Sequence, residues 1–198
     1  MVLDRSGLVG ADGPTHHGAF DLSFLRTVPG ITIMAPSNEN ELRDMIYASI
    51  DMEGPVAIRY PRGTALAQKL EDSPDVFDAR LPKVLHQGKD ILLLGAGFMT
   101  NELKKTAESL REKGYDPTLV DARFIKPLDP QCYRSLFESH KVIVTLEDNT
   151  LVSGYGSAVG EMLLDFGITD KRLLRFGLPD EFVEQGEIPS LYKLLKID

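Results

Sequence analysis

Two of the chain's four histidines, His16 and His17, stand side by side in a stretch of small and turn-forming residues. That stretch runs from residue 7 to residue 18 and also holds Asp12, and Arg5 lies just before it. Its glycines and its proline interrupt both helical and strand periodicity, so a loop is predicted. A plain turn needs no arginine or histidine pair, and imidazole titrates near physiological pH, which suits proton transfer. We therefore predict an active-site loop, with an ordinary surface turn as the alternative.

Arg62 supplies a second cation close to a predicted strand end. It follows the apolar residues 55–58, and Pro61 and Gly63 flank it. In open α/β folds, ligands bind at the carboxyl ends of strands. Guanidinium groups bind phosphate and carboxylate bidentately, so Arg5 and Arg62 are predicted to form a fork for such an anion. Two unrelated surface charges are the alternative. A metal site is disfavoured, because no further His or Cys lies near the histidine pair in the sequence.

Longer strings of the sequence carry a family resemblance. The strings that match cover residues 4–21, 34–43, 59–63, 121–129, 147–149, 154–157 and 177–180. They resemble those of the 1-deoxy-D-xylulose-5-phosphate synthases. Transketolases and the beta subunits of 2-oxo acid dehydrogenases share a looser version of the pattern and are the alternatives. The string Arg59-Tyr60-Pro61-Arg62-Gly63 is the one that favours the synthases.

The resemblance implies a transferase that uses thiamine diphosphate and Mg²⁺. Such an enzyme decarboxylates pyruvate and condenses the remaining two-carbon unit with glyceraldehyde 3-phosphate, at the start of the methylerythritol phosphate route to isoprenoids. By the same resemblance, Arg5 and Arg62 hold the phosphate of the aldehyde, whereas Asp12 and His16 contact the reacting substrate and steer proton transfers. His17 receives no catalytic role. The full-length enzyme is expected to be a homodimer.

Parts that the family needs are missing from this sequence. There is no Gly-Asp-Gly motif for the diphosphate and the magnesium ion. The family's glutamate at the aminopyrimidine lies upstream of the segment that matches Met1. We therefore expect this sequence to be a C-terminal part of a larger enzyme. Alone, it is expected to be inactive and to bind no cofactor tightly.

Composition narrows the class of protein. The chain has 198 residues, 42% of them apolar, and a formal net charge of −8 from 30 acidic and 22 basic residues. That balance argues against nucleic acid or an anionic membrane as a partner. No apolar run approaches the roughly 20 residues that a membrane span needs. The single cysteine, Cys132, excludes an internal disulfide and fits a reducing compartment. We favour the bacterial cytoplasm, with the plastid stroma as the alternative.

The pattern of apolar residues predicts an α/β fold in two parts. By the resemblance, residues 1–66 belong to a transketolase-type pyrimidine-binding domain, 67–82 form a linker, and 83–198 form a transketolase C-terminal domain with a mostly parallel sheet. Expected strands cover residues 31–34, 56–60, 91–94, 118–120, 142–146 and 173–176. Expected helices cover residues 21–26, 38–50, 101–113, 130–138 and 157–166. Ser37 is expected to cap the helix at 38–50 and Leu42, Met45, Ile46 and Ser49 to form its inner face.

Two glycine-rich turns leave rival functions open. Gly95-Ala96-Gly97 follows a predicted strand, and Asp121 ends the next one, as in nicotinamide- or flavin-binding folds. Thr100 stands where the third glycine belongs, so the helix is not expected to approach the strand closely. The turn at 153–157 opens another predicted helix, whose amides could receive an anion, although packing is preferred. A non-catalytic anion-binding or docking module is the third alternative.

Overall fold

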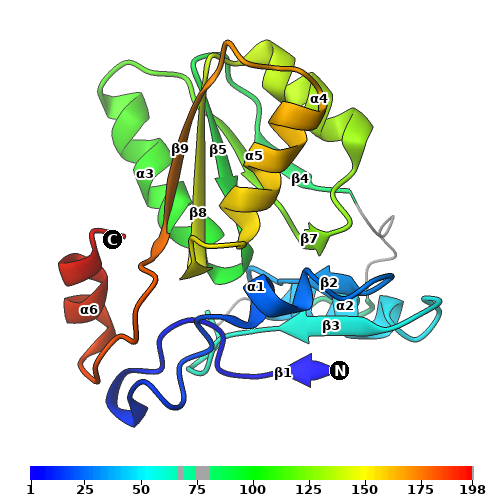
Figure 1. Cartoon of the computed structure of the whole chain (residues 1–198), viewed down its shortest axis with the longest axis vertical. Coiled ribbons are helices and arrows are strands. Elements are labelled where there is room, and N and C mark those ends of the chain that lie inside the picture. The colour runs from blue at the N-terminus through cyan, green and yellow to red at the C-terminus, as the bar shows by residue number, and fades with distance from the viewer. Residues whose placement is uncertain (67–68, 75–80, 198) are drawn as a thin grey trace.

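The computed structural model describes residues 1–66, 69–74 and 81–197 and contains two sheets (Figure 1). Residues 67–68 and 75–80 of the predicted linker lie outside the described residues. The elements in chain order are β1 (Val2–Leu3), η1 (Gly10–Asp12), α1 (Asp21–Leu25), β2 (Thr32–Met34), α2 (Glu39–Ala48), β3 (Val56–Arg59), β4 (Lys83–His86), β5 (Ile91–Gly95), η2 (Gly97–Met99), α3 (Thr100–Glu112), β6 (Thr118–Asp121), β7 (Phe124–Lys126), α4 (Pro130–Ser139), β8 (Val142–Thr150), α5 (Tyr155–Asp165), β9 (Arg172–Leu178) and α6 (Ile188–Leu195).

The first sheet has the strand order β1-β3-β2-β7. Strands β1, β3 and β2 run parallel, with Leu3 opposite Arg59. Strand β7 comes from the second half of the chain and pairs antiparallel with β2, where Met34 lies opposite Phe124. The sheet therefore joins the two predicted parts of the chain. The strand β7 was not predicted, because three residues carry too little periodicity.

The second sheet has the order β4-β6-β5-β8-β9, parallel except for the pair β4 and β6. Its central strand β5 is apolar throughout because helices cover both faces. Leu92 and Leu94 pack with residues of α4 and α5, whereas Leu93 packs with residues of α3 and α6. Figure 1 shows α3 on one side of this sheet and α4 and α5 on the other. The prediction of an α/β fold with a mostly parallel sheet is confirmed.

Helix α2 corrects two details of the sequence prediction. Asn38, not Ser37, is its N-cap, and the Asn38 side chain accepts a hydrogen bond from the amide of Glu41. The Ser37 hydroxyl instead donates to the Glu41 carboxylate at 3.0 Å. Met45 is fully buried as expected, but Ile46 is 42% exposed. The buried residues of the helix are Glu41, Asp44 and Met45, so its inner face is rotated away from the predicted one.

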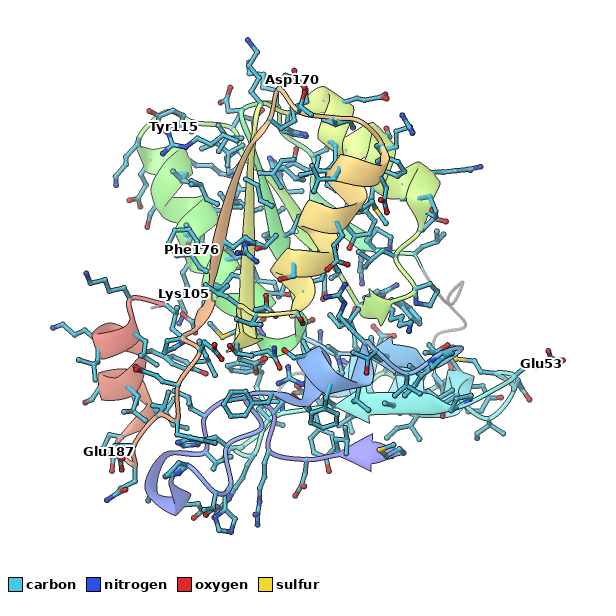
Figure 2. All side chains as sticks on the ribbon, viewed as in Figure 1. Glu53, Lys105, Tyr115, Asp170, Phe176 and Glu187 are labelled. Carbon is cyan, nitrogen blue, oxygen red and sulfur yellow. The ribbon has the colours of Figure 1, made fainter. Side chains whose placement is uncertain are left out.

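Helix α6 was not predicted, although it shapes the site. Its residue Leu191 packs into the same core cluster as Leu93. Just before it, the amide of Gly186 donates to the carbonyl of Gly10 at 3.3 Å. Figure 2 shows Glu187, the residue before α6, at the end of the molecule where the N-terminal loop lies. The chain's last helix therefore flanks the loop predicted to be the active site.

Within the described residues, no helix is both long and apolar enough to cross a membrane.

Candidate active site

Strands β1 and β3 end side by side and bring two predicted site residues close together in the fold. The amide of Tyr60 donates to the carbonyl of Leu3 at 3.0 Å, and the amide of Ser6 donates to the carbonyl of Tyr60 at 2.9 Å. Arg5 and Arg62 therefore leave adjacent parallel strands at their carboxyl ends. This is the position at which the sequence predicted an anion site.

Loop 7–18, the segment from Gly7 to Gly18, is closed at its base. The amide of Gly7 donates to the carbonyl of Gly18, and the amide of Gly18 donates to the carbonyl of Arg5, both at 3.0 Å. A Cβ atom at Gly18 would lie 2.2 Å from the carbonyl oxygen of Arg5, so a side chain there would push the two ends of the loop apart. The loop is thus a defined excursion from the sheet whose two ends are fixed to each other.

Asp12, His16 and Arg62 form one cluster. The Asp12 carboxylate accepts a hydrogen bond from the Arg62 guanidinium and forms an ion pair with it. Nδ1 of His16 lies 3.2 Å from the carbonyl oxygen of Asp12 and 3.0 Å from Oγ1 of Thr15. The Arg62 side chain is 54% exposed, so an anion from solution can reach it. The structure therefore brings together three of the four predicted site residues.

Arg5 has no described contact with this cluster. Its φ of 66° turns the chain sharply where β1 gives way to the loop. Its Nε is buried without a hydrogen-bond partner among the described residues, and the Asp4 carboxylate lies 3.9 Å away. The rest of the side chain is partly open to solvent, since Arg5 is 39% exposed. No contact joins the Arg5 guanidinium to that of Arg62 among the described interactions, so the predicted fork remains a prediction.

His17 has a structural contact that the sequence did not reveal. Its Nδ1 accepts a hydrogen bond from the amide of Val9 at 3.0 Å, across the loop. That acceptor role places the proton of the neutral ring on Nε2. His17 therefore helps to hold the shape of loop 7–18, consistent with the absence of a catalytic role in the family resemblance.

Arg59 is a buried cation beneath the loop. Its Nε donates to the Asp21 carboxylate at 2.8 Å and its Nη1 to the Asp148 carboxylate at 2.5 Å. Its Nη2 donates to the carbonyl of Gly18 at 2.9 Å. Burial alone would lower the pKa of the Arg59 guanidinium, but attraction by the two carboxylates raises that pKa above its ordinary value. Arg59 therefore stays charged and joins β3, α1, β8 and the end of the loop.

The sequence held one signal for Arg59 and none for its partners. Arg59 ends an otherwise apolar strand, and a charge in such a position is buried only when it is paired. Asp148 is 89 residues further along the chain, so no local pattern connects it to Arg59.

The side chain of Glu147 reaches from β8 to the glycine-rich turn at residues 153–157, which the sequence offers as an anion site. Its carboxylate accepts hydrogen bonds from the amides of Tyr155 and Gly156, the first residues of α5, at 2.7 and 2.8 Å. The helix N-terminus is therefore filled by the protein's own carboxylate, in line with the preferred packing role. Burial raises the pKa of Glu147 to about 7, although the two amides and Arg59 act in the opposite direction.

The Gly-x-Gly turn at residues 95–97 is packed rather than open. A Cβ atom on Gly97 would lie 3.2 Å from Cβ of Ala35, and Nδ2 of Asn101 donates to the carbonyl of Ser37 at 2.7 Å. The expectation of a loose strand-to-helix approach is wrong. A Cβ atom on Gly95 would lie only 2.6 Å from Cα of Thr100, because the missing side chain of Gly95 lets the helix approach.

Asp121, the residue considered as a ribose-binding acid, is buried beside Glu41. Burial and the charge of Glu41 hold the pKa of Asp121 well above its usual value. Burial alone would also raise the pKa of Glu41, but its ion pair with Arg123, at 2.8 Å, lowers that pKa overall. A carboxyl enclosed in this way is not available to a nucleotide, so the geometry gives no support to a nicotinamide or flavin site.

A cavity of about 410 Å³ opens beside Arg62, between the ends of β1 and β3 and helices α2 and α6. Its lining includes Ser6, Asn38, Tyr60, Phe98 and Tyr192. Among the described residues, no group of three or more His, Cys, Asp or Glu could hold a metal ion. The cavity thus offers Arg62 to a small anion, whereas Arg5, Asp12 and His16 are not among the residues that line it.

Two family models match this chain. Residues 1–66 match the transketolase pyrimidine-binding domain and residues 82–198 match the transketolase C-terminal domain.

Curated relatives resemble the chain over its whole length. The 1-deoxy-D-xylulose-5-phosphate synthase of Syntrophomonas wolfei is 44% identical, and that of Aeromonas hydrophila is 47% identical, each over 198 residues. Both matches cover 100% of this chain but 31% of the relative, so the chain spans about a third of the length of these relatives.

Solved structures share the fold. A split-gene transketolase described as an inactive beta4 tetramer superposes with a TM-score of 0.81 at 26% identity, covering 99% of this chain and 60% of that one. The transketolase of Campylobacter jejuni superposes with a TM-score of 0.74 at 18% identity, covering 100% of this chain and 29% of that one. The second likeness concerns the fold alone.

Proposed function

We propose, from the premise that this chain belongs to the transketolase family through its C-terminal domain, that it is the substrate-holding part of a 1-deoxy-D-xylulose-5-phosphate synthase. The whole enzyme would condense pyruvate with glyceraldehyde 3-phosphate and release CO₂. The observation that carries the proposal is the cluster of Asp12, His16 and Arg62. Arg62 follows β3, and β3 pairs in parallel with β1, the strand that precedes Arg5. We take the reaction from the name of the relatives that are 44–47% identical to this chain over its whole length.

Each residue has a role that its geometry permits. Arg62 is exposed enough to bind the aldehyde phosphate, and the side chain of Arg5, which is 39% exposed, is proposed to bind the same phosphate. The carboxylate of Asp12 neutralises Arg62 while no substrate is bound, so an incoming phosphate exchanges one anion for another. His16, next to Asp12, is placed to move a proton to or from a substrate oxygen.

The proposal divides the enzyme's chemistry between this chain and parts outside it. Bound thiamine diphosphate would supply the electron sink for loss of CO₂. Among the described residues, no group of three or more His, Cys, Asp or Glu could hold a metal ion, and we expect Mg²⁺ and the diphosphate to be held by parts of the enzyme outside this chain. This chain binds the phosphate of the aldehyde and transfers protons at the aldehyde group. We propose residues 1–66 and 83–198 as its two domains, a homodimer as the whole enzyme's assembly, and the bacterial cytoplasm as its location.

The chain alone is expected to bind the aldehyde phosphate weakly and to catalyse nothing. Incubation of the isolated chain with pyruvate, thiamine diphosphate and Mg²⁺ is expected to release no CO₂ above the protein-free rate. CO₂ release that disappears in Asp12→Asn would contradict the division of labour proposed here.

Anion binding tests the site directly. Titration calorimetry of the chain with glyceraldehyde 3-phosphate is expected to show binding that weakens about tenfold in Arg62→Ala and in Arg5→Ala, because each removes a charge-assisted hydrogen bond. Asp12→Asn is expected to bind about threefold more tightly, because the phosphate no longer competes with a partly exposed ion pair.

Arg134→Ala is the matched control, since Arg134 is a similarly exposed arginine that pairs with Glu138 on α4. It is expected to bind like the unmodified chain. Equal loss in all three arginine variants would indicate nonspecific attraction and count against the site. A chain that binds NADH but not the aldehyde phosphate would favour a nucleotide-binding function instead.

A further inference from the structure

We infer that Asp148, which no comparison singles out, is a positioning residue that fixes loop 7–18 to the second sheet. It lies on β8, outside the predicted pyrimidine-binding part, and its side chain is 3% exposed. It therefore cannot act on a substrate itself and must act through the residues that it holds. The consequence for catalysis rests on the function proposed above, whereas the effect on the loop does not.

The two carboxylate oxygens of Asp148 serve the two ends of the loop. Oδ2 accepts a hydrogen bond from the hydroxyl of Ser6 at 3.2 Å, directly before the loop begins. Oδ1 accepts from Arg59, whose Nη2 in turn donates to the carbonyl of Gly18, where the loop ends. One side chain thus holds the start of the loop directly and its end through one guanidinium.

The loop backbone lies directly against this side chain. A Cβ atom on Gly7 would lie 2.7 Å from Oδ2 and 2.8 Å from Cβ of Asp148. Because there is no free space at this contact, a change at Asp148 is transmitted to Gly7 and Ser6. Arg5 is the next residue along the chain, so its guanidinium moves with them.

Among the residues that the structure describes, the contact is one of two buried ion pairs that join the parts of the chain. The other is formed by Arg123 and Glu41, at 2.8 Å, with side chains 12% and 7% exposed. That pair fixes α2 near the end of β6, and the hydrogen bonds described for the Glu41 carboxylate go to Ser37 and Arg123, not to loop 7–18. A substitution in each pair can therefore distinguish a specific effect on the loop from a general loss of contact between the sheets.

Asp148→Asn tests the inference, because asparagine keeps the size but loses the charge and one acceptor. Hydrogen exchange of loop 7–18, followed by mass spectrometry on the chain, is expected to accelerate about tenfold. In the whole synthase carrying the same change, KM for glyceraldehyde 3-phosphate is expected to rise about tenfold while KM for pyruvate stays within about twofold, because Arg5 contacts only the aldehyde phosphate.

Glu41→Gln is the matched control and is expected to leave both the loop exchange and the KM for the aldehyde unchanged. Equal acceleration in both variants, or none in Asp148→Asn, would overturn the inference. Should Asp148→Asn fail to fold, Ser6→Ala removes the Oδ2 contact alone and is expected to accelerate exchange about threefold. No acceleration there would also overturn it. Faster exchange with an unchanged KM for the aldehyde supports positioning by Asp148 and contradicts the proposed function of Arg5.

Discussion

Arg59→Met is expected to destabilise the chain by about 3–5 kcal/mol, because it leaves buried charges without their partner. The Arg59 side chain is 1% exposed, and the carboxylates of Asp148 and Asp21 are 3% and 12% exposed. Methionine fills much of the arginine's volume, so the loss is expected to come from the unpaired carboxylates, and from the loss of one of the two hydrogen bonds to the carbonyl of Gly18, rather than from a cavity.

Urea denaturation followed by circular dichroism measures this loss as a shift of the transition midpoint at constant slope. Arg62→Met is the control, since Arg62 forms its ion pair with Asp12 at the surface and is 54% exposed. Its effect is expected to stay within about 1 kcal/mol. Similar effects of the two substitutions would show that burial does not distinguish the two arginines.

The double variant Arg59→Met with Asp148→Leu separates the two sources of the Arg59 effect. If the unpaired carboxylate of Asp148 causes most of the loss, the second substitution is expected to restore part of the stability, since replacing both partners of a buried pair by apolar residues is often neutral. Asp21 would still lack its partner, so complete recovery is not expected.

Much of the fold followed from local patterns. The strand at β5 and the helices at α3, α4 and α5 each carry an apolar period that is long enough to be recognised, and all four lie within a few residues of their predicted bounds. Helix α6 and strands β4 and β7 were missed because each is short or only half-buried. The Ser37 prediction failed because Ser37 and Asn38 are both good caps, and only the backbone conformation decides between them.

The candidate site followed less completely. Arg5, Asp12, His16 and Arg62 stood out because charged and titratable residues lie among glycines. The residues that hold them in place could not be recognised in the sequence, because Arg59, Gly18 and Asp148 meet only after the two sheets have packed. A sequence shows which side chains are available for chemistry, whereas a hydrogen bond across 89 positions depends on the tertiary fold.

The buried carboxyl of Glu147 is expected to make the stability of the chain depend on pH. Burial raises its pKa in the folded state to about 7, from an ordinary value of 4.5. Below pH 4.5 both the folded and the unfolded states keep the proton. Between pH 4.5 and 7 the unfolded state releases the proton while the folded state holds it, so the free energy of unfolding falls as the pH rises.

The fall that Glu147 contributes is expected to reach about 3 kcal/mol by pH 8, at 1.36 kcal/mol for each unit of pKa difference. Two neighbouring charges also act on the pKa of Glu147: Arg59 lowers it and Asp148 raises it. Glutamine cannot release a proton, so between pH 5 and pH 8 Glu147→Gln is expected to lose about 2.5 kcal/mol less stability than the unmodified chain. Denaturation curves at pH 5 and pH 8 measure the difference.

Glu138→Gln is the control, because the Glu138 side chain is 60% exposed on α4 and is expected to leave the pH dependence unchanged. Parallel pH profiles of Glu147→Gln and the unmodified chain would mean that Glu147 is already ionised in the folded state at pH 5. In that case the two amides at the start of α5 and the charge of Arg59 would outweigh the burial of the carboxyl. The glycine-rich turn would then be an anion site after all, permanently occupied by a charged side chain of the protein itself.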